Sequence, residues 1–258
     1  MPAAQHVYSH IAITGASSGL GRALAIAYAH PGATLHLCGR DAGRLAEVAA
    51  TCRSLGADVT ETLADVTDRQ AVESWINGCG RLDLVIANAG ISAGPGAGNM
   101  ESPAQIQAIF ATNVYGVFNT ASPAIATMQS QASGPNGDRG RIVIVGSIAG
   151  LIALPTTPSY SAAKAAIDFW VRATEPNLAK EGIALTLVRP GFIRTPMTAR
   201  NPYRMPGLMD SDRAAAIIRA GLAAGRPRIT FPYWFSLLAR FGNMMPKSIF
   251  NRFPRKPA

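Results

Sequence analysis

Short apolar runs alternate with stretches of helical periodicity along almost the whole chain. Several runs are unbroken blocks of valine, isoleucine and leucine, which is typical of strands that are covered on both faces. We expect seven strands, at residues 10–14, 34–38, 58–64, 82–88, 141–147, 183–189 and 228–231. The stretches between them predict helices, because their apolar residues recur at helical spacing, as at Leu45, Val48, Ala49 and Cys52 after the capping residue Asp41.

A further helix is expected to start at Ser102, because serine caps a helix and the following proline fits its first turn. Its apolar face would carry Ile106, Ile109, Phe110, Asn113 and Val117. Asn113 stands out on this face, since a buried amide needs hydrogen-bonding partners.

The alternation of strands and helices with short connections predicts an α/β fold, with a single doubly wound parallel sheet and helices on both faces. We find no internal repeat and no linker-like break before about residue 231. We therefore expect one domain over residues 1–231, followed by a C-terminal extension over residues 232–258.

The composition agrees with a folded domain and excludes several other classes. The 258 residues are 48% hydrophobic and 15% charged, so a large core can form. No apolar run approaches the roughly 20 residues that cross a bilayer, and the N-terminus lacks a secretory pattern, so we expect a cytoplasmic protein. Three cysteines without metal-like spacing predict small buried residues in a reducing compartment, and no metal site.

The formal charge of +9 is unevenly distributed. Residues 1–188 contain 11 Lys and Arg against 13 Asp and Glu, whereas residues 189–258 contain 13 against 2. This asymmetry indicates an anionic ligand or membrane surface near the C-terminal part, and a solvated basic tail explains it equally well. No recognition motif accompanies the charge, so nucleic-acid binding is not expected.

A glycine-rich turn follows the first expected strand directly and precedes a helix. Glycine lets the backbone turn sharply and approach a pyrophosphate, whose charge is stabilised by free N–H groups at a helix start. The residues expected to hold a dinucleotide here are Gly15, Ser17, Ser18, Gly19, Leu20 and Gly21. Their spacing, G-x-x-x-G-x-G, differs from the G-x-G-x-x-G pattern of other dinucleotide-binding proteins.

Tyr160 and Lys164 lie four residues apart in an expected helix, so their side chains share one face. A neighbouring positive charge favours a phenolate, which lets the phenol donate a proton to a carbonyl or accept one from an alcohol near neutral pH. Ser147, at the end of the fifth strand, would hydrogen-bond the same oxygen. Singly, each residue has an ordinary structural explanation; their joint placement favours catalysis.

The motifs together resemble the short-chain dehydrogenase/reductase family. They occur in the family's order and are Thr14–Gly21, Asn88-Ala89-Gly90, Asn113, Ser147, Tyr160, Lys164 and Pro190-Gly191. The resemblance covers about residues 8–231 and implies a Rossmann-like fold, hydride transfer with a nicotinamide cofactor, and a homo-oligomer. In the family the helix after Tyr160 often forms a subunit interface, and we expect Pro176 to kink it.

The resemblance implies a role for each catalytic residue. Tyr160 would be the acid/base that protonates the carbonyl oxygen, and Lys164 would lower the pKa of Tyr160 and hold the nicotinamide ribose. Ser147 would orient and polarise the carbonyl. Asn113 would anchor a water molecule that relays protons from Lys164 to solvent.

Further cofactor contacts are implied at both ends of the dinucleotide. They are Asp65, Val66, Asn88, Ala89 and Gly90 at the adenosine end, and Tyr160, Lys164, Pro190, Gly191, Ile193 and Thr195 at the nicotinamide end.

The end of the second strand bears on the choice of nicotinamide cofactor. An acidic residue there would bond the ribose 2′-hydroxyl and repel a 2′-phosphate. We expect the strand to end at Gly39 with Arg40 next, and a guanidinium forks onto a phosphate and stacks on adenine. Asp41 would reach the ribose if the strand were one residue longer, but we interpret it as a helix cap. NADP(H) is therefore favoured, with NAD(H) as the alternative.

The substrate side is expected to be apolar. Flexible thioethers suit a ligand of variable shape, and they would equally well fill gaps in a core. The candidates in the loop after Thr195 are Met197, Met205, Leu208 and Met209, and those after Ser147 are Ile148, Leu151 and Ile152.

The extension over residues 232–258 is rich in aromatic and basic residues. One helical face would hold Trp234, Leu237, Leu238, Phe241 and Met245, with Arg240, Lys247, Arg252, Arg255 and Lys256 interspersed. Such a segment suits peripheral contact with a membrane surface. The alternative is a helix that packs over the substrate pocket of the same domain or against a partner subunit.

We therefore expect an NADPH-dependent oxidoreductase that reduces a small apolar carbonyl compound to an alcohol. The substrate would be a lipophilic ketone, an aldehyde or a 3-oxoacyl group. One alternative is an NAD-dependent alcohol or hydroxysteroid-like dehydrogenase. Another is a non-catalytic cofactor-binding protein that docks on membranes, which the intact catalytic set disfavours because a sensor needs no proton donor.

Overall fold

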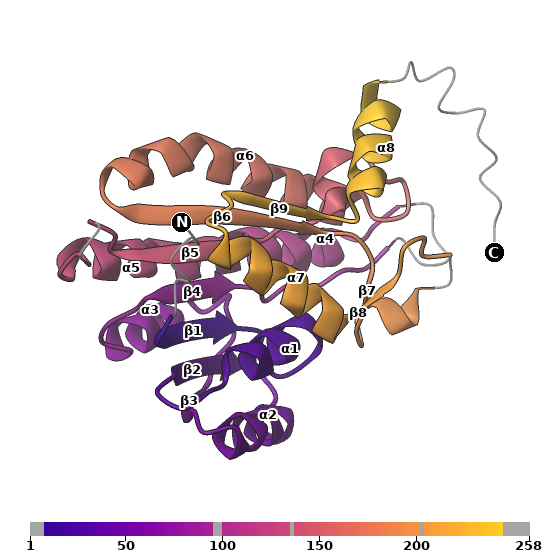
Figure 1. The fold of residues 1–258 in the computed structure, drawn as a ribbon. Coiled ribbons are helices and arrows are strands. Elements are labelled where there is room, and N and C mark those ends of the chain that lie inside the picture. Colours follow the sequence, from indigo (N-terminus) through magenta and orange to yellow (C-terminus); the bar gives the residue numbers. More distant parts are fainter. Residues whose placement is uncertain (1–7, 95–99, 135–136, 202–203, 245–258) are drawn as a thin grey trace.

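The computed structural model describes residues 8–94, 100–134, 137–201 and 204–244. A seven-stranded sheet has the order β3-β2-β1-β4-β5-β6-β9, and neighbouring strands are parallel throughout (Figure 1). Its strands are β1 (His10–Thr14), β2 (Thr34–Gly39), β3 (Asp58–Leu63), β4 (Leu84–Ala87), β5 (Gly140–Val145), β6 (Ile183–Pro190) and β9 (Arg228–Phe231). Each of the seven expected runs forms a strand, so the predicted doubly wound parallel sheet is confirmed.

Helices cover both faces of this sheet (Figure 1). One face carries α1 (Gly19–Tyr28), α2 (Ala42–Ser54) and α7 (Ser211–Ala223). The other carries α3 (Arg69–Gly78), α4 (Pro103–Phe110), α5 (Gly116–Ser130) and α6 (Pro158–Lys180). The domain is therefore a three-layer α/β/α sandwich, as strand–helix alternation requires.

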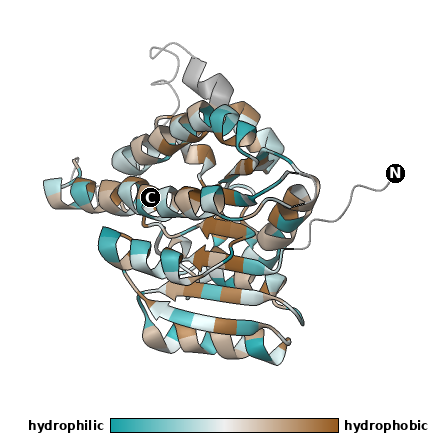
Figure 2. Ribbon diagram, turned by 90° about the vertical axis from the view of Figure 1, so that its left-hand side faces the viewer, coloured by the Kyte–Doolittle hydropathy of each residue, from teal (hydrophilic) through white to brown (hydrophobic). Residues whose placement is uncertain are grey.

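Each central strand contributes to two hydrophobic cores. Ile11 of β1 is buried on the side of α1 and α2, whereas the next residue, Ala12, is buried on the side of α3 and α5. This explains the unbroken apolar runs, because a strand covered on both faces has no solvent-facing positions. Apolar residues accordingly concentrate in the central strands (Figure 2). The free cysteines Cys38, Cys52 and Cys79 are buried in these cores, as expected.

A π-helical segment, Ala111–Tyr115, joins α4 to α5. The Ser102 hydroxyl caps α4 by accepting from the Gln105 N–H at 3.1 Å, as predicted. The expected apolar face is wrong at Ile106, which is 39% exposed, while Asn113 is fully buried. The reason is the π turn, which takes up more residues than an α turn and so rotates the later residues relative to the earlier ones.

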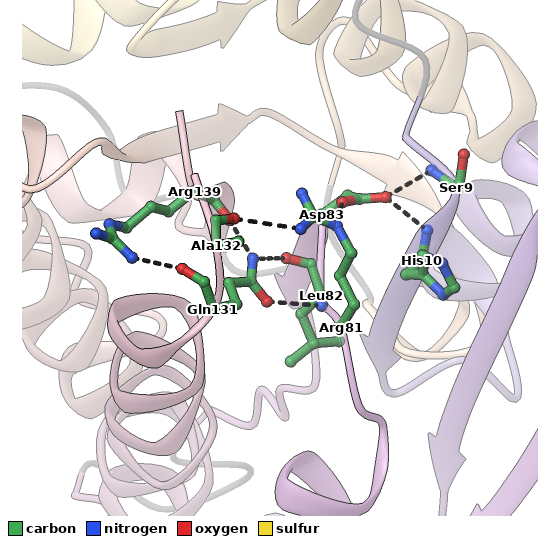
Figure 3. A network of polar contacts seen from close by, with 8 residues as sticks. All are labelled: Ser9, His10, Arg81, Leu82, Asp83, Gln131, Ala132 and Arg139. Carbon is green, nitrogen blue, oxygen red and sulfur yellow. Dashed lines mark hydrogen bonds and ion pairs between the residues drawn. The ribbon is translucent and has the colours of Figure 1, made fainter. Parts of the chain in front are cut away.

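The amino ends of β1 and β4 are tied together by side chains (Figure 3). Asp83 Oδ2 accepts from the Ser9 and His10 N–H groups, both at 3.0 Å. Gln131, directly after α5, donates to the Leu82 carbonyl at 2.9 Å and accepts from the Leu82 N–H at 3.1 Å. These bonds fix the amino edge of the sheet and leave its carboxyl edge for the pocket described below.

The helix α6 spans 23 residues and contains Pro176. Proline lacks an N–H group, so the carbonyl four residues earlier, at Arg172, loses its intrahelical donor. The helix nevertheless continues to Lys180, so the expected kink does not end it.

Beyond the sheet, β7 (Ile193–Arg194) and β8 (Met209–Asp210) form a small parallel pair, and α8 (Tyr233–Met244) projects from the carboxyl end of β9 (Figure 1). Within the described residues, no helix combines the length and hydropathy that crossing a membrane requires. Met245 and the expected cations from Lys247 onward lie outside the described residues.

Candidate active site

A pocket of about 280 Å³ lies at the carboxyl edge of the sheet. Segments that follow β1, β2, β3, β4 and β5, together with the end of β6, line it. The strand order reverses between β1 and β4, and this is where open α/β sheets bind nucleotides. The sequence-predicted site residues that line the pocket are Gly15, Ser17, Ser18, Gly19, Leu20, Arg40, Asp65, Val66, Asn88, Ala89, Gly90, Ser147, Tyr160, Lys164, Pro190, Gly191, Ile193 and Thr195.

Two expected residues, Gly21 and Asn113, are not among those that line the pocket. Gly21 lies beneath it, where a Cβ would come within 2.2 Å of the Gly15 carbonyl oxygen and 2.6 Å of Asn88 Nδ2. Only glycine fits there, so the glycine-rich turn can fold tightly over the start of α1.

The turn has the features of a phosphate cradle. Gly15 and Gly19 adopt φ values of +66° and +54°, which favour glycine. The cap residue of α1, Ser18, makes no side-chain cap bond, and the first turn of the helix has no acidic residue. The N–H groups at the start of α1 therefore remain for an anion, which the helix dipole favours. This cradle fits the pyrophosphate of a dinucleotide.

Thr14 and Asn88 hold β1 and β4 together at the pocket floor. The Thr14 hydroxyl accepts from the Asn88 and Ala89 N–H groups at 3.0 and 3.2 Å. Asn88 Nδ2 donates to the Thr14 carbonyl at 3.0 Å and to the Gly15 carbonyl at 3.3 Å. The turn after β4 is thus fixed to the glycine-rich turn.

Arg40 and Asp65 meet at the end of the pocket where adenosine is expected. Arg40 Nη1 lies 3.0 Å from Asp65 Oδ2, and the Arg40 side chain is 63% exposed. Burial raises the pKa of Asp65, but hydrogen bonds from Thr67 and the Arg40 charge outweigh it and leave that pKa below its ordinary value. The Arg40 guanidinium thus lies at the pocket with a single carboxylate partner among the described residues.

Asp41 caps α2, as the sequence analysis interpreted it. Its Oδ1 accepts from the Arg44 N–H at 3.0 Å, and its Oδ2 pairs with the Arg44 guanidinium at 2.9 Å. The backbone hydrogen bond from Arg44 lowers the pKa of Asp41. Since β2 ends at Gly39, the residue that follows the strand is Arg40, and the carboxylate is committed to the helix.

Tyr160 and Lys164 project from the first turns of α6. Tyr160 is half-buried and lines the pocket. Lys164 is 4% exposed, and its Nζ lies 5.7 Å from the centroid of the Tyr160 ring. The same Nζ donates to the Val145 carbonyl at 2.8 Å, which fixes the ammonium at the end of β5. Burial lowers the pKa of Lys164 to about 8.

Ser147 lines the pocket where β5 ends. Its Oγ accepts from the Ala149 N–H at 3.0 Å and so caps a 3₁₀ turn over Ile148–Leu151. A hydroxyl has one donor and two acceptor positions, so this bond leaves the O–H of Ser147 to donate toward a ligand oxygen.

Asn113 lies in the π-helical segment and is completely buried. Its Oδ1 accepts from the Ile91 N–H at 3.0 Å, and its Nδ2 donates to the Ile91 carbonyl at 2.7 Å. A Cβ on Gly90 would come within 2.8 Å of Asn113 Oδ1 and 3.7 Å of Lys164 Nζ. Asn113 is therefore next to the lysine, with its carboxamide bonded to the loop after β4. Its expected role as a water anchor stays a prediction.

The turn after β7 contains a residue that the sequence analysis missed. The Thr198 hydroxyl accepts from the Thr195 N–H at 3.0 Å and bonds the Ile193 carbonyl at 2.6 Å. Pro196, Met197 and Thr198 line the pocket next to Thr195. The hydroxyl three residues after Thr195 was the available signal, because such spacing closes an ST turn.

The substrate side agrees only in part with expectation. Met197 lines the pocket, whereas Met209 packs against the core beside α7. Ile148 is buried, and neither it nor Leu151 nor Ile152 is among the lining residues. Met205 and Leu208 are half-buried and do not line it either.

The first turns of α8 pack near the end of the pocket where nicotinamide is expected. Phe235 stacks on Phe192 with ring centroids 5.9 Å apart. A Cβ on Gly191 would meet Phe235 at 3.5 Å, and one on Gly207 would meet Trp234 at 3.3 Å. The beginning of the extension therefore contacts the segment that follows β6.

The sequence model of the short chain dehydrogenases matches residues 9–205. An uncharacterized oxidoreductase of Myxococcus xanthus is 30% identical over 257 residues, which cover 98% of this chain and 99% of the relative. 11-beta-hydroxysteroid dehydrogenase 1A of Arabidopsis thaliana is 33% identical over 261 residues, which cover 93% and 72% respectively.

Two solved structures are similar over 97% of this chain and 98% of their own. A short chain dehydrogenase/reductase from Burkholderia phymatum in complex with NAD has a TM-score of 0.81 at 25% identity. A short-chain dehydrogenase from Sphingobium yanoikuyae in complex with NADPH has a TM-score of 0.78 at 25% identity. The match of the family model extends over the glycine-rich turn, α6 and the turn after β7. The chain therefore belongs to the short-chain dehydrogenase/reductase family and is an oxidoreductase that works with a nicotinamide cofactor.

Proposed function

We propose that this protein is an NADPH-dependent reductase of a lipophilic carbonyl compound. The observation that carries the proposal is the buried ammonium of Lys164, held beside the Tyr160 ring at the inner end of a dinucleotide pocket. Such a pair is arranged to deliver a proton rather than only to bind a nucleotide. In the alternative, an alcohol dehydrogenase, the same two residues would accept the proton of the alcohol as it is oxidised.

A reduced nicotinamide supplies a hydride when bound, and the protein's own residues supply the rest. The Ser147 O–H donates to the carbonyl oxygen and orients it. Tyr160 gives its phenolic proton to that oxygen as the C–O double bond becomes a single bond, so the product is a neutral alcohol. The Lys164 ammonium stabilises the phenolate that remains until solvent returns a proton.

Replacing Tyr160 by phenylalanine tests the proton donor, since it removes only the hydroxyl. We expect Tyr160→Phe to lower kcat by about 100- to 10,000-fold, the usual contribution of general acid catalysis. NADPH affinity, measured by quenching of protein fluorescence, should change little. A matched control is Tyr115→Phe, because Tyr115 is 62% exposed outside the pocket. Wild-type turnover by Tyr160→Phe would disprove the assigned role.

The proposed preference for NADPH depends on Arg40. An exposed guanidinium at the end of β2, where NAD-specific proteins carry an acid, supports pairing with a 2′-phosphate. Arg40→Ala should weaken NADPH binding by about 10- to 100-fold, the value of one charge-assisted contact, and leave NADH binding nearly unchanged. Arg53→Ala, which breaks an ion pair with Glu61 on β3, is the control. Equal losses for both cofactors would favour the NAD-dependent dehydrogenase instead.

We propose a lipophilic substrate because apolar and aromatic side chains flank the catalytic end. Met197 lines the pocket, and Phe235 stacks on Phe192 beside it. The relative from Arabidopsis thaliana named as a hydroxysteroid dehydrogenase supports the same class. NADPH consumption with ketones, aldehydes and 3-oxoacyl thioesters of increasing chain length tests it: kcat/KM should rise with chain length. A preference for short polar carbonyls would overturn this assignment.

The α8 helix favours a peripheral contact with an anionic lipid surface. Over residues 233–239, where burial is described, Ser236 and Ala239 are buried, whereas Trp234, Leu237 and Leu238 on the opposite side are 49%, 50% and 58% exposed. The chain contains no Asp or Glu after Asp212 and many arginines, which would complement anionic headgroups. Exposed apolar residues on a helix that begins beside the pocket suit delivery of a membrane-dissolved substrate.

Co-sedimentation with vesicles tests the lipid contact. The full chain should bind phosphatidylcholine vesicles that contain about 30% phosphatidylglycerol, and release with salt. Leu237→Asn/Leu238→Asn should weaken binding about tenfold or more. Leu63→Asn, at a residue 60% exposed on the edge strand β3, should not weaken it. If the full chain does not bind the vesicles and instead forms a dimer that the double variant dissociates, this face would be an interface with a second copy of the chain.

The family is commonly oligomeric, and an aromatic face on α5 and α6 supports a self-association site. Phe118 packs edge-on against Trp170 at 5.2 Å and near Tyr115 at 6.4 Å. Phe169 is 69% exposed next to them. We expect Phe169→Glu to dissociate a homo-oligomer in light-scattering measurements, with Leu63→Glu, on the edge strand β3, as the control for added charge. A monomeric wild-type protein would exclude the interface.

A further inference from the structure

Asp168 and Arg189 form a buried ion pair behind the catalytic residues. The Arg189 Nε and Nη2 groups donate to Asp168 Oδ1 and Oδ2, the second at 3.0 Å. The two residues are 4% and 3% exposed, and no other ion pair in the described parts of the chain has both side chains buried. Arg172 approaches the same carboxylate more distantly, at 3.9 Å, from the solvent side.

Asp168 is placed on the catalytic face of α6. It lies four residues after Lys164 and eight after Tyr160, so all three side chains point to the same side of the helix, one turn apart. Lys164 bonds the Val145 carbonyl at the end of β5, and Asp168 bonds Arg189 near the end of β6. Two polar links on successive turns thus connect α6 to two neighbouring strands.

Arg189 is placed where it can transmit this link to the pocket. It directly precedes Pro190 and Gly191, which line the nicotinamide end. A Cβ on Gly146 would lie 4.0 Å from Arg189 Cγ, so the arginine stem passes Gly146, the residue before Ser147. The pair therefore contacts the segments that carry the proposed catalytic groups: α6, the end of β5 before Ser147, and the end of β6.

A buried ion pair holds a helix against a sheet at a high cost in desolvation free energy. Removing both charges from water costs several kcal/mol per ion, and apolar residues of similar volume often stabilise a fold equally well. The α6 residues Ala163, Ile167 and Val171 pack against the sheet through apolar side chains. Apolar packing has no direction, whereas a two-bond guanidinium–carboxylate contact fixes distance and angle.

We propose that Asp168 and Arg189 are positioning residues, which fix the register of α6 against the ends of β5 and β6. The pair sets how far Tyr160 and Lys164 stand from Ser147 and from the Pro190–Gly191 segment. It touches neither substrate nor cofactor. The inference rests on the proposed reductase function, because its effect is on the geometry of proton delivery.

The test replaces both charges by apolar residues of similar size, Asp168→Leu/Arg189→Met. The substitution removes one positive and one negative charge, so any change at the site reports moved atoms rather than a lost field. We expect kcat to fall by about 10- to 100-fold, as displacements near 1 Å do, with KM and NADPH affinity within about threefold of wild type. The alkaline limb of the pH profile of kcat should shift to higher pH, because the ammonium stands further from the phenol.

A second variant and a matched control complete the experiment. Arg189→Lys keeps the charge but not the two-bond contact, so it should lower kcat while the protein stays folded. The control Arg69→Met/Glu73→Leu removes an exposed ion pair on α3 and should leave kcat unchanged.

The possible results separate the two proposals. Wild-type kcat and pH profile in both variants, whatever their melting temperatures, would show that the pair is only structural. Absence of carbonyl reduction by the wild-type protein in the same assay would instead overturn the proposed function.

Discussion

Asn113 closes a ring of two hydrogen bonds with the backbone of Ile91, in the way that a neighbouring strand would. The carboxamide donates and accepts at once, so it satisfies both polar groups of one residue in the loop after β4. That loop carries Gly90, which separates Asn113 from Lys164. The amide therefore fixes the loop beside Lys164.

Removing this amide should be costly. Asn113→Ala leaves an N–H and a carbonyl without partners, and we expect the free energy of unfolding to fall by about 2 to 4 kcal/mol in urea titrations. Asn119→Ala is the control, because among the described residues the Asn119 side chain makes one hydrogen bond, to the Val66 carbonyl at 2.9 Å. The free energy of unfolding of Asn119→Ala should fall by about 1 kcal/mol. Equal losses for the two variants would contradict the paired arrangement.

Gly21 should tolerate no side chain. A Cβ there would overlap the Gly15 carbonyl, so Gly21→Ala must push the glycine-rich turn away from α1. We expect NADPH affinity, measured by calorimetry, to fall at least about tenfold, because several backbone donors to the pyrophosphate are misplaced together.

The contrast for this prediction is another helical glycine. A Cβ on Gly78 of α3 meets nothing within 4 Å, and its backbone is helical. Gly78→Ala should therefore leave cofactor affinity intact and raise stability by up to about 1 kcal/mol. A normal NADPH affinity in Gly21→Ala would mean that the turn can relax without loss.

The sheet was predictable because its signals are local. A strand buried on both faces must be apolar throughout, and that pattern marked the central strands β1, β4, β5 and β6, whereas the edge strand β3 is largely exposed. The end of β2 could also be predicted from the sequence, since Asp41 has the spacing of a helix cap and does cap α2. The expected face at Ile106 failed because a π turn changes the helical phase, and a pattern of apolar positions assumes a constant period.

The contacts between distant segments were not predictable. Asp168 and Arg189 are 21 residues apart, and either could have been a surface charge until the fold brought them together. The same holds for the Lys164 contact with Val145. Such pairings depend on the relative placement of helix and sheet, which no local pattern contains.

Lys164 should make stability depend on pH in a defined window. Its pKa is about 8 in the folded protein against 10.5 ordinarily, because burial disfavours the ammonium. Between these values the unfolded chain binds more protons than the folded one, so this group's contribution to stability rises with pH.

The comparison with Lys164→Met isolates that contribution, because methionine keeps the bulk and does not titrate. Lys164→Met should be the more stable protein at about pH 7.5, and its advantage should shrink by about 2 kcal/mol at about pH 9.5. Urea titrations of both proteins at the two pH values measure it. A constant difference would mean that the buried lysine keeps its ordinary pKa.

Glu101 should influence Tyr160 through the start of α6. Its carboxylate accepts from the Ser159 N–H at 2.9 Å and from the Ser159 hydroxyl at 2.8 Å. The residue in the capping position, Thr157, makes no side-chain cap bond, so Glu101 caps the helix from a different segment. A negative charge there is favoured by the helix dipole.

Glu101→Gln keeps the shape but removes the charge, and we expect stability to fall by about 1 kcal/mol and kcat to fall with it, because the residue after Ser159 is the proposed proton donor. Ser102→Ala separates the two effects. It removes the ordinary cap of α4 and should cost a similar free energy of unfolding without changing kcat. If both variants lose stability and neither loses turnover, the first turn of α6 is held in place by its packing rather than by the carboxylate.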